Sequence, residues 1–190
     1  MRLVLASASP RRLDLLKRIG VAPDAVVPAE IDETPVRAEL PPHYALRVAR
    51  EKAAAVRARE PGAIVLAADT VVAAGRRILP KTEEEGEARR MLTLLSGRRH
   101  RVHTGVCVVA GDGAERHRLS TSMVAFKRFS DAELDDYLAS GEWRGAAGGY
   151  AIQGRAEALV RQISGSWSGI VGLPLFETRA LLLAAGYPLA

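Results

Sequence analysis

The sequence predicts a mixed α/β fold, in which an elongated and largely antiparallel mixed sheet is flanked by helices. Short runs of β-forming residues alternate along the chain with amphipathic stretches of helical spacing, which is typical of a sheet covered by helices. Two long β-rich runs, residues 102–110 and 119–129, are joined by Gly111-Asp112-Gly113 and are expected to pair antiparallel. The 190 residues are expected to form one domain spanning residues 1–190.

The composition is that of an ordinary globular protein, with 48% hydrophobic and 26% charged residues. The formal net charge of +5 comes from scattered arginines and suits an anionic small molecule as well as nucleic acid. The one cysteine, Cys107, lies in an apolar run, so cysteines can build neither a disulfide framework nor a zinc site. Because no apolar run reaches membrane-spanning length and no secretory signal is present, we expect a cytoplasmic protein without a membrane partner.

The first element is an apolar strand that runs through small residues into a helix. Ser9 and Pro10 predict the helix start, since serine favours the N-cap and proline the first turn. The unpaired N–H groups of this helix start would lie beside Ser7, Arg11 and Arg12, which together can hold an anion such as a phosphate. A capped helix with solvated arginines is the plainer interpretation, and these residues alone leave both open.

A loop of acids separates the first helix from the second. The first helix is expected to stop at Gly20, and residues 25–27 are expected to form a short strand. Residues 30–33 then carry three carboxylates, for which a solvated acidic turn is the simpler interpretation. A long amphipathic helix is expected over residues 41–59, and most of its cations, which include Arg47, Arg50 and Lys52, fit a solvated face, although the spacing alone does not single one out.

A polar pair interrupts the most apolar stretch of the chain, residues 64–74, at Asp69 and Thr70. A carboxylate in such a strand must be paired, bind a metal or face a cleft, because burying it alone costs several kcal/mol. We therefore favour a functional role for Asp69. The hairpin that follows turns at Gly75 and returns to Lys81, which is expected to face the same cleft.

Two capping patterns predict the starts of further helices. Thr82 with Glu85 predicts a helix that runs to Ser96-Gly97, and Ser130 with Glu133 predicts another. Residues 145–154 form a glycine-rich loop that would let a ligand approach the backbone, although they match neither a P-loop nor a dinucleotide motif.

The last part of the chain is expected to hold a strand at residues 160–163, a glycine-rich turn at 165–172 and a final helix that starts at Leu173-Pro174. Neither His100 nor His103 is given a catalytic role, because a lone histidine beside a β run is more often structural.

Taken in order, these motifs cover nearly the whole chain and resemble those of the Maf-like nucleotide pyrophosphatases, also called septum formation inhibitor Maf. One departure is Thr82, since the family usually has a proline directly after the lysine that matches Lys81. The segments that carry the resemblance are Leu5-Ala6-Ser7-Ala8-Ser9-Pro10-Arg11-Arg12, Asp32-Glu33, Arg50-Glu51-Lys52-Ala53, Ala68-Asp69-Thr70, Ile78-Leu79 with Lys81, Leu95-Ser96-Gly97, His103-Thr104, Tyr150-Ala151-Ile152-Gln153-Gly154 and Val171-Gly172-Leu173-Pro174.

The resemblance implies an enzyme that hydrolyses a nucleoside triphosphate between its α and β phosphates and uses a divalent metal cation, Mg²⁺ or Mn²⁺. It implies a fold similar to the inosine-triphosphate pyrophosphatases, with a cleft between two lobes. It also implies a homodimer, and a role in removing modified nucleotides that is linked to division arrest.

Several residues fit roles in this chemistry. Asp69 is the expected catalytic base, and Glu33 and Asp69 are the expected metal ligands. Phosphoryl chemistry depends mainly on positioning and charge neutralisation, which nearby cations can supply. The expected phosphate-binding residues are Ser7, Arg11, Arg12, Lys52 and Lys81.

The branch of the family that this chain resembles acts on dTTP and UTP, and Arg11, Thr70 and Gln153 are expected to set this selectivity. The Gln153 amide offers both a donor and an acceptor, so it can match the carbonyl and N–H edge that uracil and thymine share. The branch that resembles 7-methyl-GTP pyrophosphatases typically has glutamine after the aspartate and Ser-Glu-Gly in the later loop. This chain has Thr70 and Ile152-Gln153-Gly154 at those places.

A rival hypothesis is a non-enzymatic protein that binds nucleic acid or regulates septum formation. The same cations could then hold backbone phosphates. The carboxylates argue against this hypothesis, because without a metal Asp69 and Glu33 would repel a phosphate backbone. We therefore do not expect nucleic acid as the partner, and expect a nucleoside triphosphate as the substrate.

Overall fold

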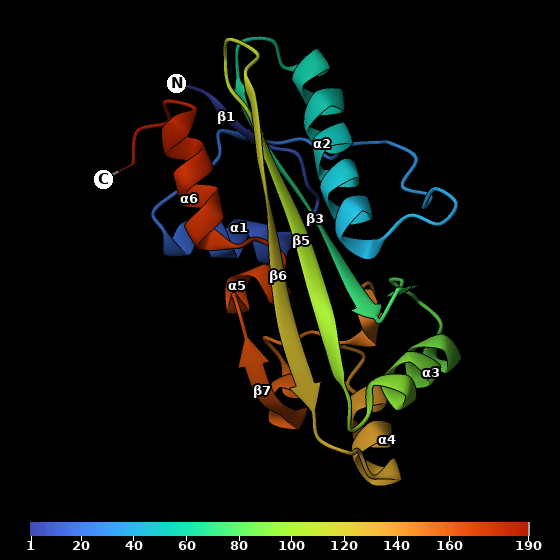
Figure 1. Cartoon of the computed structure of the whole chain (residues 1–190). Coiled ribbons are helices and arrows are strands. Elements are labelled where there is room, and N and C mark those ends of the chain that lie inside the picture. Colours follow the sequence, from blue (N-terminus) through green and yellow to red (C-terminus); the bar gives the residue numbers. More distant parts are fainter. Residues whose placement is uncertain (190) are drawn as a thin grey trace.

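The computed structural model describes residues 1–189, which form one seven-stranded mixed sheet with helices on both faces (Figure 1). The sheet order is β2-β1-β3-β5-β6-β7, and β4 pairs with β3 outside this path. The strands are β1 (Leu3–Leu5), β2 (Ala25–Val26), β3 (Ile64–Ala74), β4 (Arg77–Leu79), β5 (Arg99–Val109), β6 (Glu115–Phe126) and β7 (Val160–Ser164). The helices are α1 (Pro10–Arg18), α2 (Pro41–Arg59), α3 (Glu85–Leu95), α4 (Asp131–Ala139), α5 (Trp167–Val171) and α6 (Leu175–Ala184).

The three long strands β3, β5 and β6 run the length of the molecule and give it an elongated shape (Figure 1). β1 pairs parallel to β2 and β3, whereas β3, β5, β6 and β7 pair antiparallel in that order. The predicted mixed α/β fold with a largely antiparallel sheet is therefore confirmed. The second long strand differs in its bounds from residues 119–129, because it begins at Glu115 and ends at Phe126.

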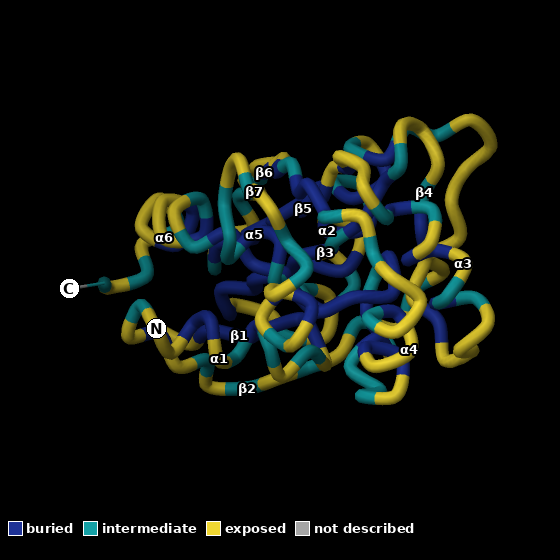
Figure 2. Tube along the Cα trace, turned by 90° about the horizontal axis from the view of Figure 1, so that it is seen from below, coloured by how far each residue is buried: buried dark blue, intermediate teal, exposed yellow. Residues whose placement is uncertain are grey.

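The side chains of β3 alternate between the two faces of the sheet, as the pleat requires. Ile64 and Leu66 pack in a cluster with residues of α1 and α6, while Val65 and Ala67 pack with residues of α2. Figure 2 shows the buried tube through the middle of the molecule at β3 and β5, and exposed residues on the outer loops and on α6. This alternation decides the faces on which the polar residues of β3 lie.

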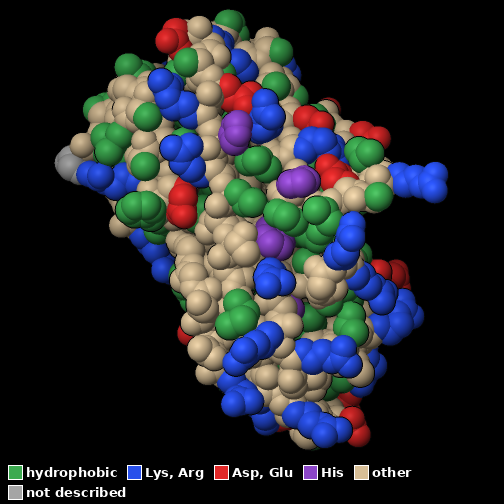
Figure 3. Space-filling view, viewed as in Figure 1, with side chains coloured by type: hydrophobic (Ala, Val, Ile, Leu, Met, Phe, Trp, Pro, Cys, Tyr) green, Lys and Arg blue, Asp and Glu red, His purple; other side chains and the backbone are tan. Residues whose placement is uncertain are grey.

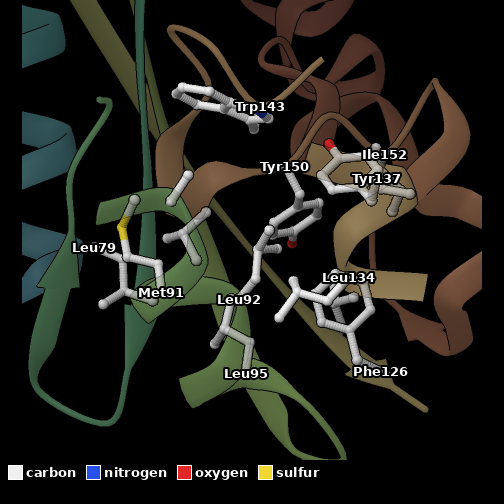
Figure 4. Packing of buried hydrophobic residues seen from close by; sticks show 14 of the residues in the cluster. Leu79, Met91, Leu92, Leu95, Phe126, Leu134, Tyr137, Trp143, Tyr150 and Ile152 are labelled. Atoms are coloured by element: carbon white, nitrogen blue, oxygen red, sulfur yellow. The ribbon is translucent and has the colours of Figure 1, made fainter. Parts of the chain in front are cut away.

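A second core lies at the other end of the long strands, where α3 and α4 cover them (Figure 1). Figure 4 shows the rings of Trp143, Tyr150 and Tyr137 among the aliphatic side chains of α3. Trp143 is fully buried, and its Nε1–H donates to the Leu138 carbonyl at 2.9 Å. The glycine-rich loop is thereby anchored in this core. No helix within residues 1–189 is long and apolar enough to cross a bilayer.

The capping patterns had mixed outcomes. The box of Ser130 and Glu133 is confirmed, since both reciprocal hydrogen bonds are present. The box of Thr82 and Glu85 is wrong, because the helix begins at Glu85 and the Thr82 hydroxyl accepts from Glu84 N. The Thr82 carbonyl accepts from the backbone of Gly145, so a tertiary contact fixes this segment before the helix starts. Ser9 is at the N-cap of α1 as predicted, but its side chain makes no capping bond.

The stretch expected to be a glycine-rich turn at residues 165–172 instead contains the short helix α5. The hydroxyl of Ser166 accepts from Gly169 N at 3.0 Å and caps its first turn. Glycine is a poor helix former, which is why local propensity favoured a turn. The final helix starts at Leu175 rather than at Leu173-Pro174.

We expect His100 to make the protein less stable as the pH falls. His100 is 3% exposed, and its Nε2 lies 2.7 Å from the Tyr150 hydroxyl. Burial lowers the pKa of His100 from 6.5 to about 4. Between these values the unfolded chain binds a proton that the folded chain does not, so stability is full above about pH 6.5 and falls toward pH 4, by about 3 kcal/mol in all.

This prediction is tested by urea unfolding at a series of pH values between 4 and 7. The free energy of unfolding of His100→Gln is expected to change less steeply with pH than that of the wild type. The exposed His43, changed to Gln, is the control and should keep the wild-type slope. An unchanged slope in His100→Gln would contradict the prediction. His103, whose pKa is lowered by burial and by Arg101, accounts for part of the slope that remains.

Candidate active site

The candidate site lies at a gap in one edge of the sheet. β1 pairs with β3 at Ile64, Val65 and Leu66, and β4 pairs with the same edge further along, at Val72, Ala73 and Ala74. Since β1 is parallel and β4 antiparallel to β3, their carboxyl ends point toward each other. Between them, no strand within residues 1–189 pairs with residues 67–71 on this edge. Ligands of open α/β sheets bind at such carboxyl ends.

A lysine joins two carboxylates in this gap. Lys52 Nζ lies 2.8 Å from Asp69 Oδ1 and 2.9 Å from Glu33 Oε1. Lys52 is 7% exposed and Asp69 is 3% exposed, so this ion pair is buried, whereas Glu33 is exposed. Asp69 lies on the α2 face because of the alternation along β3, and α2 carries Lys52. Among the cations of α2 that spacing could not tell apart, Lys52 is therefore one that does not belong to a solvated face.

Helix α2 can bring Lys52 to Asp69 because Gly105 lies beneath it. Gly105 is the register partner of Asp69 on β5. A Cβ added at Gly105 would lie 2.4 Å from the Ala45 carbonyl oxygen, so only glycine permits the helix to pack this closely. The acidic loop is held nearby, since the Tyr44 hydroxyl donates to the Glu33 carbonyl at 2.8 Å. Burial, followed by the charges of Asp69 and Glu33, raises the pKa of Tyr44 to about 12.

The first helix contributes a buried arginine. Arg12 is 7% exposed; its Nη1 donates to Ser7 Oγ at 2.8 Å and its Nε donates to the Gly172 carbonyl at 2.8 Å. Burial lowers the pKa of Arg12, and the negative charge of Asp69 partly offsets this by raising it. The plainer interpretation, in which both arginines are solvated, is therefore wrong for Arg12, while Arg11 is half-buried.

Lys81 follows β4 and lies where three neighbouring hollows meet. Desolvation, followed by the charges of Arg12 and Lys52, lowers the pKa of Lys81, and Asp69 opposes this. The three hollows have different linings. The first is lined by Arg11, Arg12, Thr70, Lys81 and Gln153, the second by Ser7, Arg12, Glu33, Lys52 and Lys81, and the third by Glu33, Tyr44, Asp69, Thr70 and Lys81, among others.

All nine of the expected site residues thus line one group of adjoining hollows, although they come from six separate parts of the chain. The cations that lie outside it are spread over the surface, as Figure 3 shows for one face. Sequence reasoning missed two contributors. Tyr44 supports the acidic loop, and Thr104 contacts Thr70 with its hydroxyl at 3.0 Å. A tyrosine in an amphipathic helix is ordinary and carried no signal, whereas Thr104 belongs to the His103-Thr104 segment of the family resemblance, which gave it no role.

A divalent metal is implied by the family resemblance, and the donors present can be compared with what it needs. Within residues 1–189 there is no cluster of three or more His, Cys, Asp or Glu residues that could hold a metal alone. Two carboxylates, on Glu33 and Asp69, do meet around Lys52. Mg²⁺ often takes only one or two carboxylates and completes its shell with substrate phosphates and water. The residues fit a metal that is shared with a phosphate ligand.

A family model described as Maf-like protein matches residues 2–185. The chain belongs to the Maf-like family. Two relatives of this Maf-like chain are dTTP/UTP pyrophosphatases. The one from Caulobacter vibrioides is 60% identical and covers 97% of this chain and 96% of its own. The one from Sphingopyxis alaskensis is 63% identical and covers 98% of each chain.

Solved structures that resemble the Maf-like chain have low sequence identity to it. A HAM1 protein from Coxiella burnetii is 19% identical, with a TM-score of 0.45, and the match covers 68% of this chain and 74% of that one. A nucleoside-triphosphatase / dITP/XTP pyrophosphatase from Mycobacterium abscessus is 20% identical, with a TM-score of 0.42 and coverage of 68% and 76%.

Proposed function

We propose that this Maf-like chain hydrolyses dTTP and UTP to the nucleoside monophosphate and pyrophosphate. The observation that carries the proposal is the buried contact of Lys52 with Asp69 at the gap in the sheet, where Glu33, the arginines of α1 and Lys81 converge. The dTTP/UTP pyrophosphatases that are 60% and 63% identical over nearly the full length support the same activity.

In the proposed mechanism the cations bind the triphosphate. Arg12 is fixed by its hydrogen bonds to Ser7 and Gly172, so it loses little side-chain entropy when it binds a phosphate. Lys81 lies beside it and adds a second positive charge. Bringing such groups together before the reaction is how phosphoryl-transfer sites stabilise the charge of the transition state.

Asp69 is assigned the role of general base. It would take a proton from the water that attacks the α-phosphorus, while the pyrophosphate leaves from the opposite side. Lys52 donates to Oδ1, so we assign the proton to the other carboxylate oxygen, Oδ2. The same lysine holds Glu33 close to Asp69.

Glu33 and Asp69 are the residues that would hold the divalent cation, Mg²⁺ or Mn²⁺. When bound there, it would neutralise the negative charge that develops on the leaving pyrophosphate. The carboxylates would then share the cation with the phosphates of the substrate. The homodimer, the cytoplasmic location and a role in septum formation stay predictions.

Arg11, Thr70 and Gln153 are assigned to the recognition of the base. They line the same hollow, on the other face of β3 from Lys52. The Gln153 amide can pair with the carbonyl and N–H edge of uracil or thymine. A pocket fitted to one ring excludes a purine by size, and unpaired polar groups penalise a wrong pyrimidine edge.

The test is the rate of pyrophosphate release from dTTP, UTP, CTP, GTP and 7-methyl-GTP, with Mg²⁺ and with a chelator in its place. We expect dTTP and UTP to be the preferred substrates and the chelator to abolish hydrolysis. A preference for a purine nucleotide would overturn the selectivity and leave the pyrophosphatase activity. No pyrophosphate release at all, together with tight and salt-sensitive DNA binding, would favour the rival nucleic-acid-binding hypothesis.

A further inference from the structure

The hydroxyl of Thr104 fixes the direction of the hydroxyl of Thr70. Thr104 is 1% exposed, and its Oγ1 lies 2.7 Å from the Gly169 carbonyl oxygen and 3.0 Å from Thr70 Oγ1. A carbonyl oxygen can only accept, and a threonine hydroxyl has only one proton to donate. Since Thr104 donates to Gly169, the proton between the two threonines must come from Thr70.

The Gly169 carbonyl needs this proton because of the way α5 ends. The backbone N–H groups of Gly172 and Leu173 both donate to the Ser168 carbonyl, at 3.0 and 2.9 Å. The Gly169 carbonyl is therefore one of the unpaired acceptors at the end of the helix. Thr104 satisfies it in the interior, where an unsatisfied carbonyl would be costly, so its proton is committed to that bond.

Thr70 consequently presents only lone pairs to the hollow that it lines. The hollow is otherwise rich in donors, since Arg11, Arg12 and Lys81 cannot accept a hydrogen bond. Ser9, Tyr150 and Gln153 also line the hollow and can each donate or accept, whereas the Thr70 hydroxyl is restricted to accepting and therefore selects a ligand group that carries a proton. A ribose hydroxyl can donate or accept and would need no fixed direction, whereas a ring N–H can only donate.

We propose that Thr104 is a positioning residue that makes Thr70 an acceptor for the imide N–H of a uracil or thymine base. This rests on the proposed function. Cytosine has a bare nitrogen at the same ring position, so two lone pairs would face each other and its binding would be penalised. The Gln153 amide cannot supply this discrimination alone, because it can turn over and pair with either edge. The Thr70 hydroxyl cannot become a donor to the base in this way, because its proton is used in the hydrogen bond to Thr104 Oγ1.

The experiment compares kcat/KM for UTP and CTP in the wild type, Thr104→Val and Thr104→Ser. Valine matches the shape of threonine but cannot accept the Thr70 proton, so Thr70 becomes free to donate to cytosine. We expect the UTP/CTP ratio of kcat/KM to fall about tenfold in Thr104→Val, with an increase for CTP. Thr104→Ser keeps the hydroxyl and is expected to keep the wild-type ratio.

The ratio separates this role from a purely structural one, because a loss of folded protein lowers both rates equally. An unchanged ratio in Thr104→Val, or a lost ratio in Thr104→Ser, would overturn the proposal and leave the pyrophosphatase function intact. A wild-type enzyme that hydrolyses UTP and CTP equally well would also overturn it. A wild type that hydrolyses neither nucleotide would reject the proposed function itself, and this inference with it.

Discussion

Asp69→Asn is expected to lower kcat for dTTP by about 10²- to 10⁴-fold, which is the range that a general base contributes. The amide keeps the shape of the carboxylate, and its oxygen can still accept from Lys52, but it cannot take a proton from water. The change also removes one charge from the buried Lys52–Asp69 ion pair and one carboxylate that would hold the metal, so some loss of stability is expected beside the loss of turnover. The measurement is kcat under saturating dTTP and Mg²⁺, with the thermal unfolding midpoint as the check on folding.

Asp14→Asn is the matched control for this variant. Asp14 is an exposed carboxylate on α1 that pairs with Lys17 and lines none of the three hollows, so the same chemical change there should leave kcat unchanged. Turnover close to that of the wild type in Asp69→Asn would refute the assignment of the base. It would leave open only a role of Asp69 in holding the site together.

Gly105→Ala is expected to reduce the free energy of unfolding by about 3 kcal/mol or more, a large effect for one added methyl group. The new Cβ would lie 2.4 Å from the Ala45 carbonyl oxygen and 2.8 Å from the Leu46 Cα. Both are backbone atoms of α2 and cannot rotate away, so the whole helix must move off the sheet. Urea unfolding followed by circular dichroism measures the loss.

Gly86→Ala is the matched control, since it makes the same change in the first turn of α3. A Cβ at Gly86 would meet no atom within 4 Å, and alanine favours a helix by up to about 1 kcal/mol over glycine. The two variants should therefore change stability in opposite directions. If the two variants had the same free energy of unfolding, the packing of α2 on β5 would not depend on the glycine at position 105. We also expect Gly105→Ala to lose activity, because α2 carries Lys52.

The sequence predicted the elements that depend on local pattern. Hydrophobic periodicity predicted α2 and the long strands. The position of Asp69 in an apolar run predicted that this carboxylate has a functional role. Cap chemistry succeeded where the neighbours along the chain decide the outcome, as at Ser130. It failed at Thr82, where a hydrogen bond from the distant Gly145 holds the backbone.

The arrangement of the site required the tertiary structure. Nothing in the spacing of α2 separates Lys52 from the solvated cations around it, because its role depends on how closely the helix packs on β5. Thr104 was part of a motif of the family resemblance, but its role becomes visible only when the Gly169 carbonyl is placed beside it. Residue type and order predicted which groups take part, and only the fold shows which atoms they meet.

Asp69 and Thr70 are neighbours in the sequence, yet the pleat of β3 places them on opposite faces of the sheet. Selection for a new nucleobase can therefore act on Thr70, Thr104 and Gln153 without moving the atoms of Lys52 or Asp69. Turnover and substrate range are then separate traits that can evolve one at a time.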